Sequence, residues 1–201
     1  MNYFTADPHF GHGNIIKYCN RPFADAAEMD AVLTANWNSR VQPEDDIYIL
    51  GDFCMSSSPA KAEAYLLSLN GRKHLIRGNH DTFLKKHPER FAGLLCEICD
   101  YKELHLPSGR TYILMHYPLL FWNGSADPNV VQLYGHIHNN EYCNALTGRM
   151  LRSLNVGVDL HGFAPLSEDQ VWALVQERSA RLQDSPLLII DEQKGFDGQA
   201  R

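Results

Sequence analysis

The chain has 201 residues, of which 44% are apolar and 21% are charged. This length and composition exclude a wholly disordered or low-complexity chain and indicate one domain. Acidic residues (24) outnumber basic ones (18), and the net charge of −6 excludes a surface that coats nucleic acid or an anionic membrane as a whole. Ten histidines are the unusual feature of the composition.

The first half of the sequence predicts short apolar strands that alternate with amphipathic helices. The strands are expected at residues 3–6, 47–50 and 74–77. One helix should begin at Asp25, where Glu28 completes a capping box, and another at Ser58, which is followed by proline at the favoured first position. This order is typical of a mostly parallel sheet covered by helices.

The second half is richer in predicted strands. Residues 101–106 and 111–115 flank a Pro-Ser-Gly-Arg turn and should form a hairpin, and a short strand is expected at 132–134. A second hairpin is predicted from residues 141–145 and 151–158, on either side of a Thr-Gly turn.

The C-terminal part should begin with a helix capped by Ser167 and Gln170. The apolar run 187–190 is a candidate edge strand, and residues 191–201 read as a polar tail. We therefore expect one domain over residues 1–190.

The expected cellular location of the protein and the redox state of its thiols can be inferred from the cysteines and the apolar segments. The sequence has no signal-peptide pattern at its start and no apolar run near the roughly 20 residues that span a bilayer. Five scattered cysteines indicate reduced thiols and a cytoplasmic protein. Cys96 and Cys99 form a lone CxxC, which we interpret as two buried structural thiols rather than a redox or zinc site.

Residues that can bind metal follow the predicted strands, at the point where each strand ends. They come from five separate segments: Asp7 and His9, Asp52, Asn79 and His80, His116, and His136 and His138. Ligand sites in open α/β sheets form outside the carboxyl ends of the strands, so these side chains should meet at one edge.

The number and type of these groups favour two metal ions. Imidazole with carboxylate suits Mn, Fe, Zn or Ni. Seven ligands (the eight residues above without His80) are too many for one ion with an open position, but they fit two ions that share a carboxylate. A single Asp-x-His or Gly-Asp is ordinary loop chemistry, whereas the complete ordered set is not explained by coincidence.

The ordered set resembles the calcineurin-like metallophosphoesterase superfamily. Its blocks, Asp-x-His, Gly-Asp, Gly-Asn-His-Asp, His and Gly-His-x-His, all occur between Asp7 and His138, about two-thirds of the chain. The opening segment 7–16 and the Asn-Arg-Pro-Phe at 20–23 look like a compact bacterial and phage-type subgroup. The resemblance implies a four-layer α/β/β/α sandwich of two mixed sheets flanked by helices.

The resemblance also implies a role for each site residue. Asp7, His9 and His138 would hold one metal ion, Asn79, His116 and His136 the other, and Asp52 would bridge them. His80 would lie beside the substrate phosphate and protonate the leaving oxygen. Asp81 would either orient His80 or cap the following helix.

The activity implied is metal-dependent hydrolysis of a phosphoester by in-line attack of a metal-bridging hydroxide. We expect two divalent ions, manganese first, and a small, possibly nucleotide-like substrate, with a diester favoured over a monoester because the loops are modest. His12 and Arg21 are candidate substrate contacts. The alternative is that His12 lies behind the ligands or on the surface and that Arg21 forms a loop salt bridge. The alternatives are a non-catalytic scaffold of the same fold, or a nuclease acting on short oligonucleotides rather than on extended nucleic acid.

Overall fold

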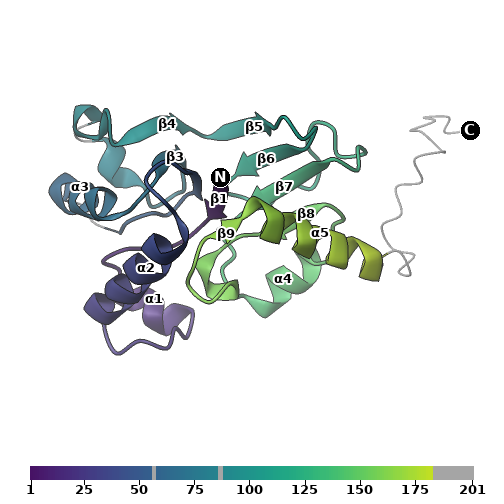
Figure 1. The fold of residues 1–201 in the computed structure, drawn as a ribbon. Helices are drawn as coiled ribbons and strands as arrows, with labels where there is room; N and C mark the ends of the chain where they lie inside the picture. The colour runs from purple at the N-terminus through teal and green to yellow at the C-terminus, as the bar shows by residue number, and fades with distance from the viewer. Residues whose placement is uncertain (56–57, 86–87, 183–201) are drawn as a thin grey trace, which may run out of the picture.

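The computed structural model describes residues 1–55, 58–85 and 88–182. Within this part the chain forms two mixed β-sheets flanked by helices, as the resemblance implies (Figure 1). The predicted strand at 187–190 and the tail at 191–201 lie outside the described residues, so the expected domain boundary stays a prediction.

The first sheet has five strands in the order β4-β3-β2-β1-β9. Their bounds are β1 (Asn2–Thr5), β2 (Asp46–Leu50), β3 (Arg72–Ile76), β4 (Leu95–Cys99) and β9 (Leu166–Ser167). Strands β1 to β4 run parallel, and β9 pairs antiparallel with β1. The predicted strands of the first half are therefore confirmed, and β9 is an edge strand that the sequence did not indicate.

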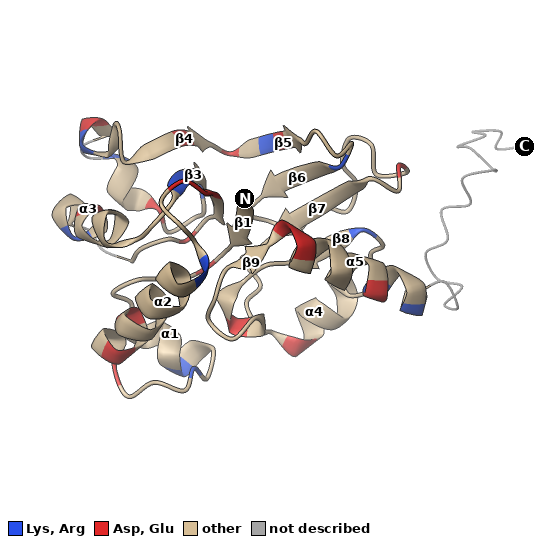
Figure 2. Cartoon of the chain, in the orientation of Figure 1, with Lys and Arg blue, Asp and Glu red and all other residues tan. Residues whose placement is uncertain are grey.

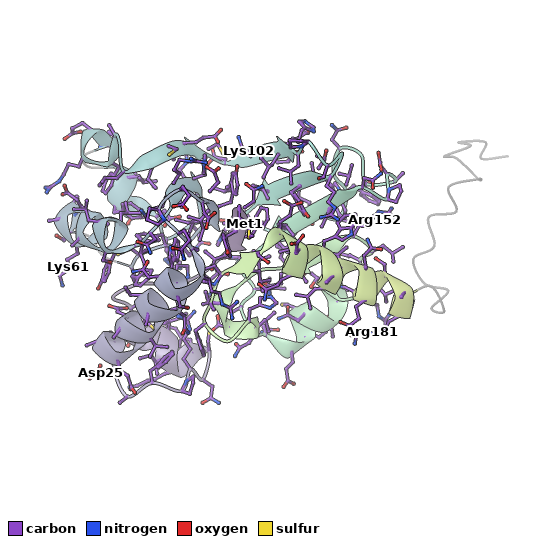
Figure 3. All side chains as sticks on the ribbon, viewed as in Figure 1. Met1, Asp25, Lys61, Lys102, Arg152 and Arg181 are labelled. Carbon is purple, nitrogen blue, oxygen red and sulfur yellow. The ribbon has the colours of Figure 1, made fainter. Side chains whose placement is uncertain are left out.

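Three helices cover one face of this sheet: α1 (Gly13–Tyr18), α2 (Ala26–Arg40) and α3 (Pro59–Ser68). The predicted start of α2 is confirmed: the Asp25 carboxylate, labelled in Figure 3, accepts the Glu28 N–H at 2.9 Å. Helix α1 is not among the helices that the sequence predicts.

The second sheet has four strands in the order β5-β6-β7-β8. Their bounds are β5 (Tyr101–His105), β6 (Thr111–Met115), β7 (Val130–Tyr134) and β8 (Ser153–Asn155). Strands β5 and β6 form the predicted antiparallel hairpin, whereas β6, β7 and β8 run parallel.

The two sheets pack face to face through a second core. Phe4 of β1 stacks on Tyr48 of β2 and touches Tyr112 of β6, with ring centroids 5.5 and 5.1 Å apart. Leu114 and Leu133 of the second sheet belong to the same buried cluster. Helix α5 (Glu168–Leu182) adds two buried valines to this core, and its predicted cap is confirmed by reciprocal bonds between Ser167 and Gln170.

One predicted hairpin is wrong. Residues 141–145 lie in helix α4 (Glu141–Thr147), and β8 pairs in parallel with β7 instead of turning back on a neighbour. The Asn140 side chain accepts the Cys143 N–H at 2.9 Å and so begins a helix, which Gly148 ends. The expected Thr-Gly turn is thus a helix terminus.

The interpretation of the CxxC is corrected in one respect. Cys96 and Cys99 both lie on β4, but Cys96 is exposed and Cys99 is half-buried, so they are not two buried thiols. Strand β4 is an edge of the first sheet, which leaves its outer residues uncovered.

The carboxyl ends of both sheets meet at one place. Just after β1, Ala6 donates to the carbonyl of Val156, and the Val156 N–H in turn bonds the carbonyl of Tyr134 at the end of β7. The segments that follow β1, β2, β3, β6 and β7 are therefore gathered at the same edge.

Candidate metal centre

The structure brings the predicted ligands together in two groups. Asp7, His9 and His138 form what we call the first group, and the ligand atoms that they offer all lie within 4.8 Å of one another. Asp52, His116 and His136 form the second group under the same limit. Asn79, predicted for the second ion, has its Oδ1 3.1 Å from Nε2 of His116.

Asp52 belongs to the second group and also faces the first, as a bridging ligand should. Its Oδ2 is 3.5 Å from Nε2 of His9 and 3.6 Å from Nε2 of His116. Its other oxygen, Oδ1, accepts the backbone N–H of His80 at 2.7 Å. The carboxylate is therefore fixed by one oxygen while the other faces both groups.

Asp7 is held in the same way. Oδ2 accepts the backbone N–H of His136 at 2.8 Å, whereas the buried Oδ1 has no hydrogen-bond partner among the described residues. Nε2 of His9 is also buried without such a partner. Polar atoms rarely stay buried and unpaired, so a carboxylate and an imidazole left in this way fit a divalent cation.

The protonation behaviour of the site agrees with this fit. Burial raises the pKa of Asp7 to about 8, and the nearby His138 offsets only part of this rise. Burial lowers the pKa values of His9, His116 and His136. Neutral imidazole is the form that binds metal.

Hydrogen bonds set which ring nitrogen His116 and His138 present. His116 Nδ1 lies 2.8 Å from the carbonyl of Leu50, to which it donates, so Nε2 is the unprotonated atom on the side of Asp52. His138 Nδ1 lies 2.8 Å from Oδ2 of Asp159. Burial alone would lower the pKa of His138, but the bond to Asp159 and the nearby Asp7 raise it to about 10.

The backbone at this edge is unusual. Eight non-glycine residues of the described chain have positive φ, and five of them are predicted ligands: Asp7, His9, Asp52, His136 and His138. A left-handed backbone conformation is unfavourable for residues other than glycine, and residues in this conformation are concentrated at functional sites. The sharp turns after the strands aim these side chains into the centre instead of along the sheet.

Three motif glycines make room for the ligands. A Cβ added to Gly51 would lie 2.4 Å from His116 Nδ1, and one on Gly78 would lie 2.3 Å from Asp52 Oδ1. On Gly135 it would lie 2.5 Å from Asp7 Oδ2. The glycines before Asp52, Asn79 and His136 are thus required by close packing against a ligand from another segment.

His80 and His12 lie beside the first group. The ring of His80 is 5.5 Å from that of His9, and the residue is half-buried. His12 is half-buried, and its Nδ1 lies 3.3 Å from His9 Nδ1. This contact matches the alternative reading of His12, a histidine that supports a ligand from behind.

Arg21 lies beneath the site instead of on its rim. It is 4% exposed, and its guanidinium pairs with the carboxylate of Asp159. The structure therefore matches the alternative reading of Arg21, a salt bridge.

Two acidic residues have roles that the sequence reasoning did not assign. Asp159 was not singled out at all. Asp81 neither caps the following 3₁₀ turn (Thr82–Lys85) nor orients His80: its carboxylate accepts the N–H groups of Asp52, Phe53 and Gly78. The loop after β3 is thereby tied to the loop after β2.

Charged residues of both signs occur along the described chain (Figure 2). Figure 2 shows basic and acidic residues interspersed along the chain rather than separated into two regions. No helix of the described residues is long and apolar enough to cross a bilayer.

Comparison with known proteins identifies relatives over most of the chain. An uncharacterized protein of Methanocaldococcus jannaschii is 35% identical over 87% of this chain and 91% of its own length. The Gene 66 protein of Mycobacterium phage D29 is 30% identical over 83% of this chain and 92% of its own length. A crystal structure of a protein of unknown function from Aquifex aeolicus superposes with a TM-score of 0.67, at 29% identity, covering 87% of this chain and 98% of that one.

The sequence pattern of the calcineurin-like phosphoesterase family matches residues 3–163, a range that includes every predicted ligand. Membership of this family implies metal-dependent hydrolysis of phosphoesters. With two ligand groups joined at Asp52 and the family pattern spanning both, the chain belongs to the calcineurin-like phosphoesterases.

Proposed function

We propose that this protein is a phosphodiesterase that works with two divalent ions, preferably manganese. Asp7, His9 and His138 would hold one ion, Asn79, His116 and His136 the other, and Asp52 both. The proposal is carried by one observation: Asp52 Oδ2 lies 3.5 and 3.6 Å from a histidine of each group. The mixed nitrogen and oxygen donors suit manganese.

Bound ions of this kind neutralise charge on a phosphoryl group and lower the pKa of water. The chain supplies the rest of the chemistry. The buried His9 and His116 and the two fixed carboxylates keep the ligand set rigid, so little reorganisation is needed during reaction. His80, half-buried beside His9, would give a proton to the leaving oxygen.

The choice of a diester rests on the openness of the outer side. Asn79 and His136 are exposed, and His80 is half-buried. A diester carries a second substituent on phosphorus that an enclosed site would exclude. An open site accepts this substituent, including a nucleoside, without a separate binding domain.

The test compares matched esters on manganese-loaded protein. Bis(p-nitrophenyl) phosphate should be hydrolysed with a higher kcat/KM than p-nitrophenyl phosphate. His80→Ala should keep the manganese content while lowering kcat by about 10²–10⁴-fold on a diester with an alkyl leaving group, which must be protonated. The loss should be smaller for p-nitrophenolate, which leaves without a proton.

His105→Ala is the matched control, because this histidine is exposed at the far end of β5. It should leave both metal content and kcat unchanged. A higher kcat/KM for the monoester would contradict the diester assignment. Metal binding without turnover of any ester, dinucleotide or short oligonucleotide would favour the scaffold instead.

A further inference from the structure

The buried guanidinium of Arg21 contacts Asp159 and the backbone of the segment that carries Asp7 and His9. Nε and Nη2 bind the two oxygens of Asp159 at 2.7 and 3.1 Å. Nη2 also donates to the carbonyl of Asp7 at 2.8 Å, and Nη1 donates to the carbonyl of Pro8 at 2.9 Å. One side chain therefore holds both peptide groups between Asp7 and His9.

Asp159 extends this contact to the third ligand. Its Oδ2 is 2.8 Å from Nδ1 of His138, and its side chain is 1% exposed. The bond leaves Nε2 of His138 for a metal ion. The ion pair of Arg21 and Asp159 thus reaches Asp7, His9 and His138, which are all the members of the first group.

These three ligands need external support because their backbone is strained. Their φ angles are 57° for Asp7, 54° for His9 and 47° for His138. Such conformations persist only where the surroundings hold them. The guanidinium is itself held, since it lies 5.8 Å from the ring centroid of Phe163.

The second group is supported by different atoms. His116 is oriented by the carbonyl of Leu50, and Asp52 by the N–H of His80. Within the described part of the chain, the hydrogen bonds of Arg21 and Asp159 do not reach these residues.

We propose that Arg21 and Asp159 are positioning residues that form a clamp for the first group. They strengthen the binding of the ion held by this group and do not affect the binding of the ion held by the second group. This inference rests on the proposed two-ion centre. Residues that hydrogen-bond to metal ligands typically contribute about 10–100-fold to metal affinity, and we expect a contribution in this range from Arg21 and Asp159.

The experiment measures Mn²⁺ affinity by titration calorimetry on metal-stripped protein in two backgrounds. His116→Ala leaves the first group as the remaining site, and His9→Ala leaves the second. Into each background we place Arg21→Met together with Asp159→Leu, which removes both buried charges and leaves neither unpaired. Asp159→Asn is the second variant, because it keeps the size of the side chain if the double replacement does not fold.

The inference predicts that affinity falls about 10–100-fold in the His116→Ala background and is unchanged in the His9→Ala background. Thermal unfolding of the metal-free proteins checks that each variant is folded. Equal losses in both backgrounds would indicate a purely structural ion pair and overturn the inference, as would an unchanged affinity in the His116→Ala background. If the unmodified protein itself fails to bind two Mn²⁺ ions, the proposed function fails with it, whereas two ions without selective loss refute only the clamp.

Discussion

Replacing Asp81 with alanine should destabilise the fold and displace Asp52 at the same time. The Asp81 carboxylate is 4% exposed and accepts three backbone N–H groups, at 2.8 to 3.0 Å. Two of them belong to Asp52 and Phe53, which are themselves buried. Alanine would leave these donors without an acceptor.

The expected magnitude follows from the two buried donors. An unsatisfied buried donor costs about 1–3 kcal/mol, so the pair costs about 2–6 kcal/mol. Burial raises the pKa of Asp81 to about 6, which shows that enclosing the carboxylate is itself unfavourable and offsets part of this loss. We therefore expect the free energy of unfolding to fall by about 2–4 kcal/mol, and Tm to fall by about 4–16 °C for a domain of this size.

The assay is thermal unfolding of the metal-free protein, followed by measurement of the manganese bound at saturation. Asp25→Ala is the matched control, since it also removes a carboxylate that accepts a backbone N–H, but at an exposed helix start. The control should cost about 0.5–2 kcal/mol and leave metal binding intact. If Asp81→Ala were no more destabilising than this control and bound manganese normally, the role assigned to Asp81 would be refuted.

Three further predictions concern packing and charge. Gly135→Ala should reduce manganese binding, because its Cβ would lie 2.5 Å from Asp7 Oδ2; normal occupancy would argue against the tight packing of this turn. Phe4→Ala should lower the free energy of unfolding in urea by about 3–5 kcal/mol, since the fully buried ring joins both sheets; a loss below about 1 kcal/mol would contradict this. Hydrogen bonds from Arg72 and His74 lower the pKa of Asp46 from 3.8 to about 2. The ionised Asp46 therefore stabilises the folded protein fully above pH 4, and this stabilisation is lost as the pH falls toward 2. Asp46→Asn should therefore flatten the dependence of Tm on pH between 4 and 2, and an unchanged slope would exclude this ion pair as its cause.

The ligand positions were predictable because each ligand follows a strand, and each strand is recognisable as a short continuous run of apolar residues. Asp7 after β1 and Asp52 after β2 illustrate this: the strand ends locally, and parallel pairing then places the ends side by side. Short glycine-containing blocks mark these turns, so both the ligand and the space around it have a local signal.

Asp159 has no such signal. Its partner Arg21 is 138 positions away along the chain, and the pairing arises only when the first and last segments of the site meet. The same holds for Asp81, whose acceptor role depends on the contact between two loops.

Helix α4 shows how local chemistry can override a strand pattern. Tyr142 and Cys143 favoured a strand, but the Asn140 side chain bonds the Cys143 N–H and begins a helix. Asn144 of this helix also donates to the carbonyl of His138, in the loop after β7.

The most direct measurement of the central claim is anomalous diffraction from crystals of the protein soaked in Mn²⁺. Two peaks are predicted, one between Asp7, His9 and His138 and one beside Asn79, His116 and His136, with Asp52 in contact with both. A single peak, or a second ion bound away from Asp52, would contradict a shared two-ion centre.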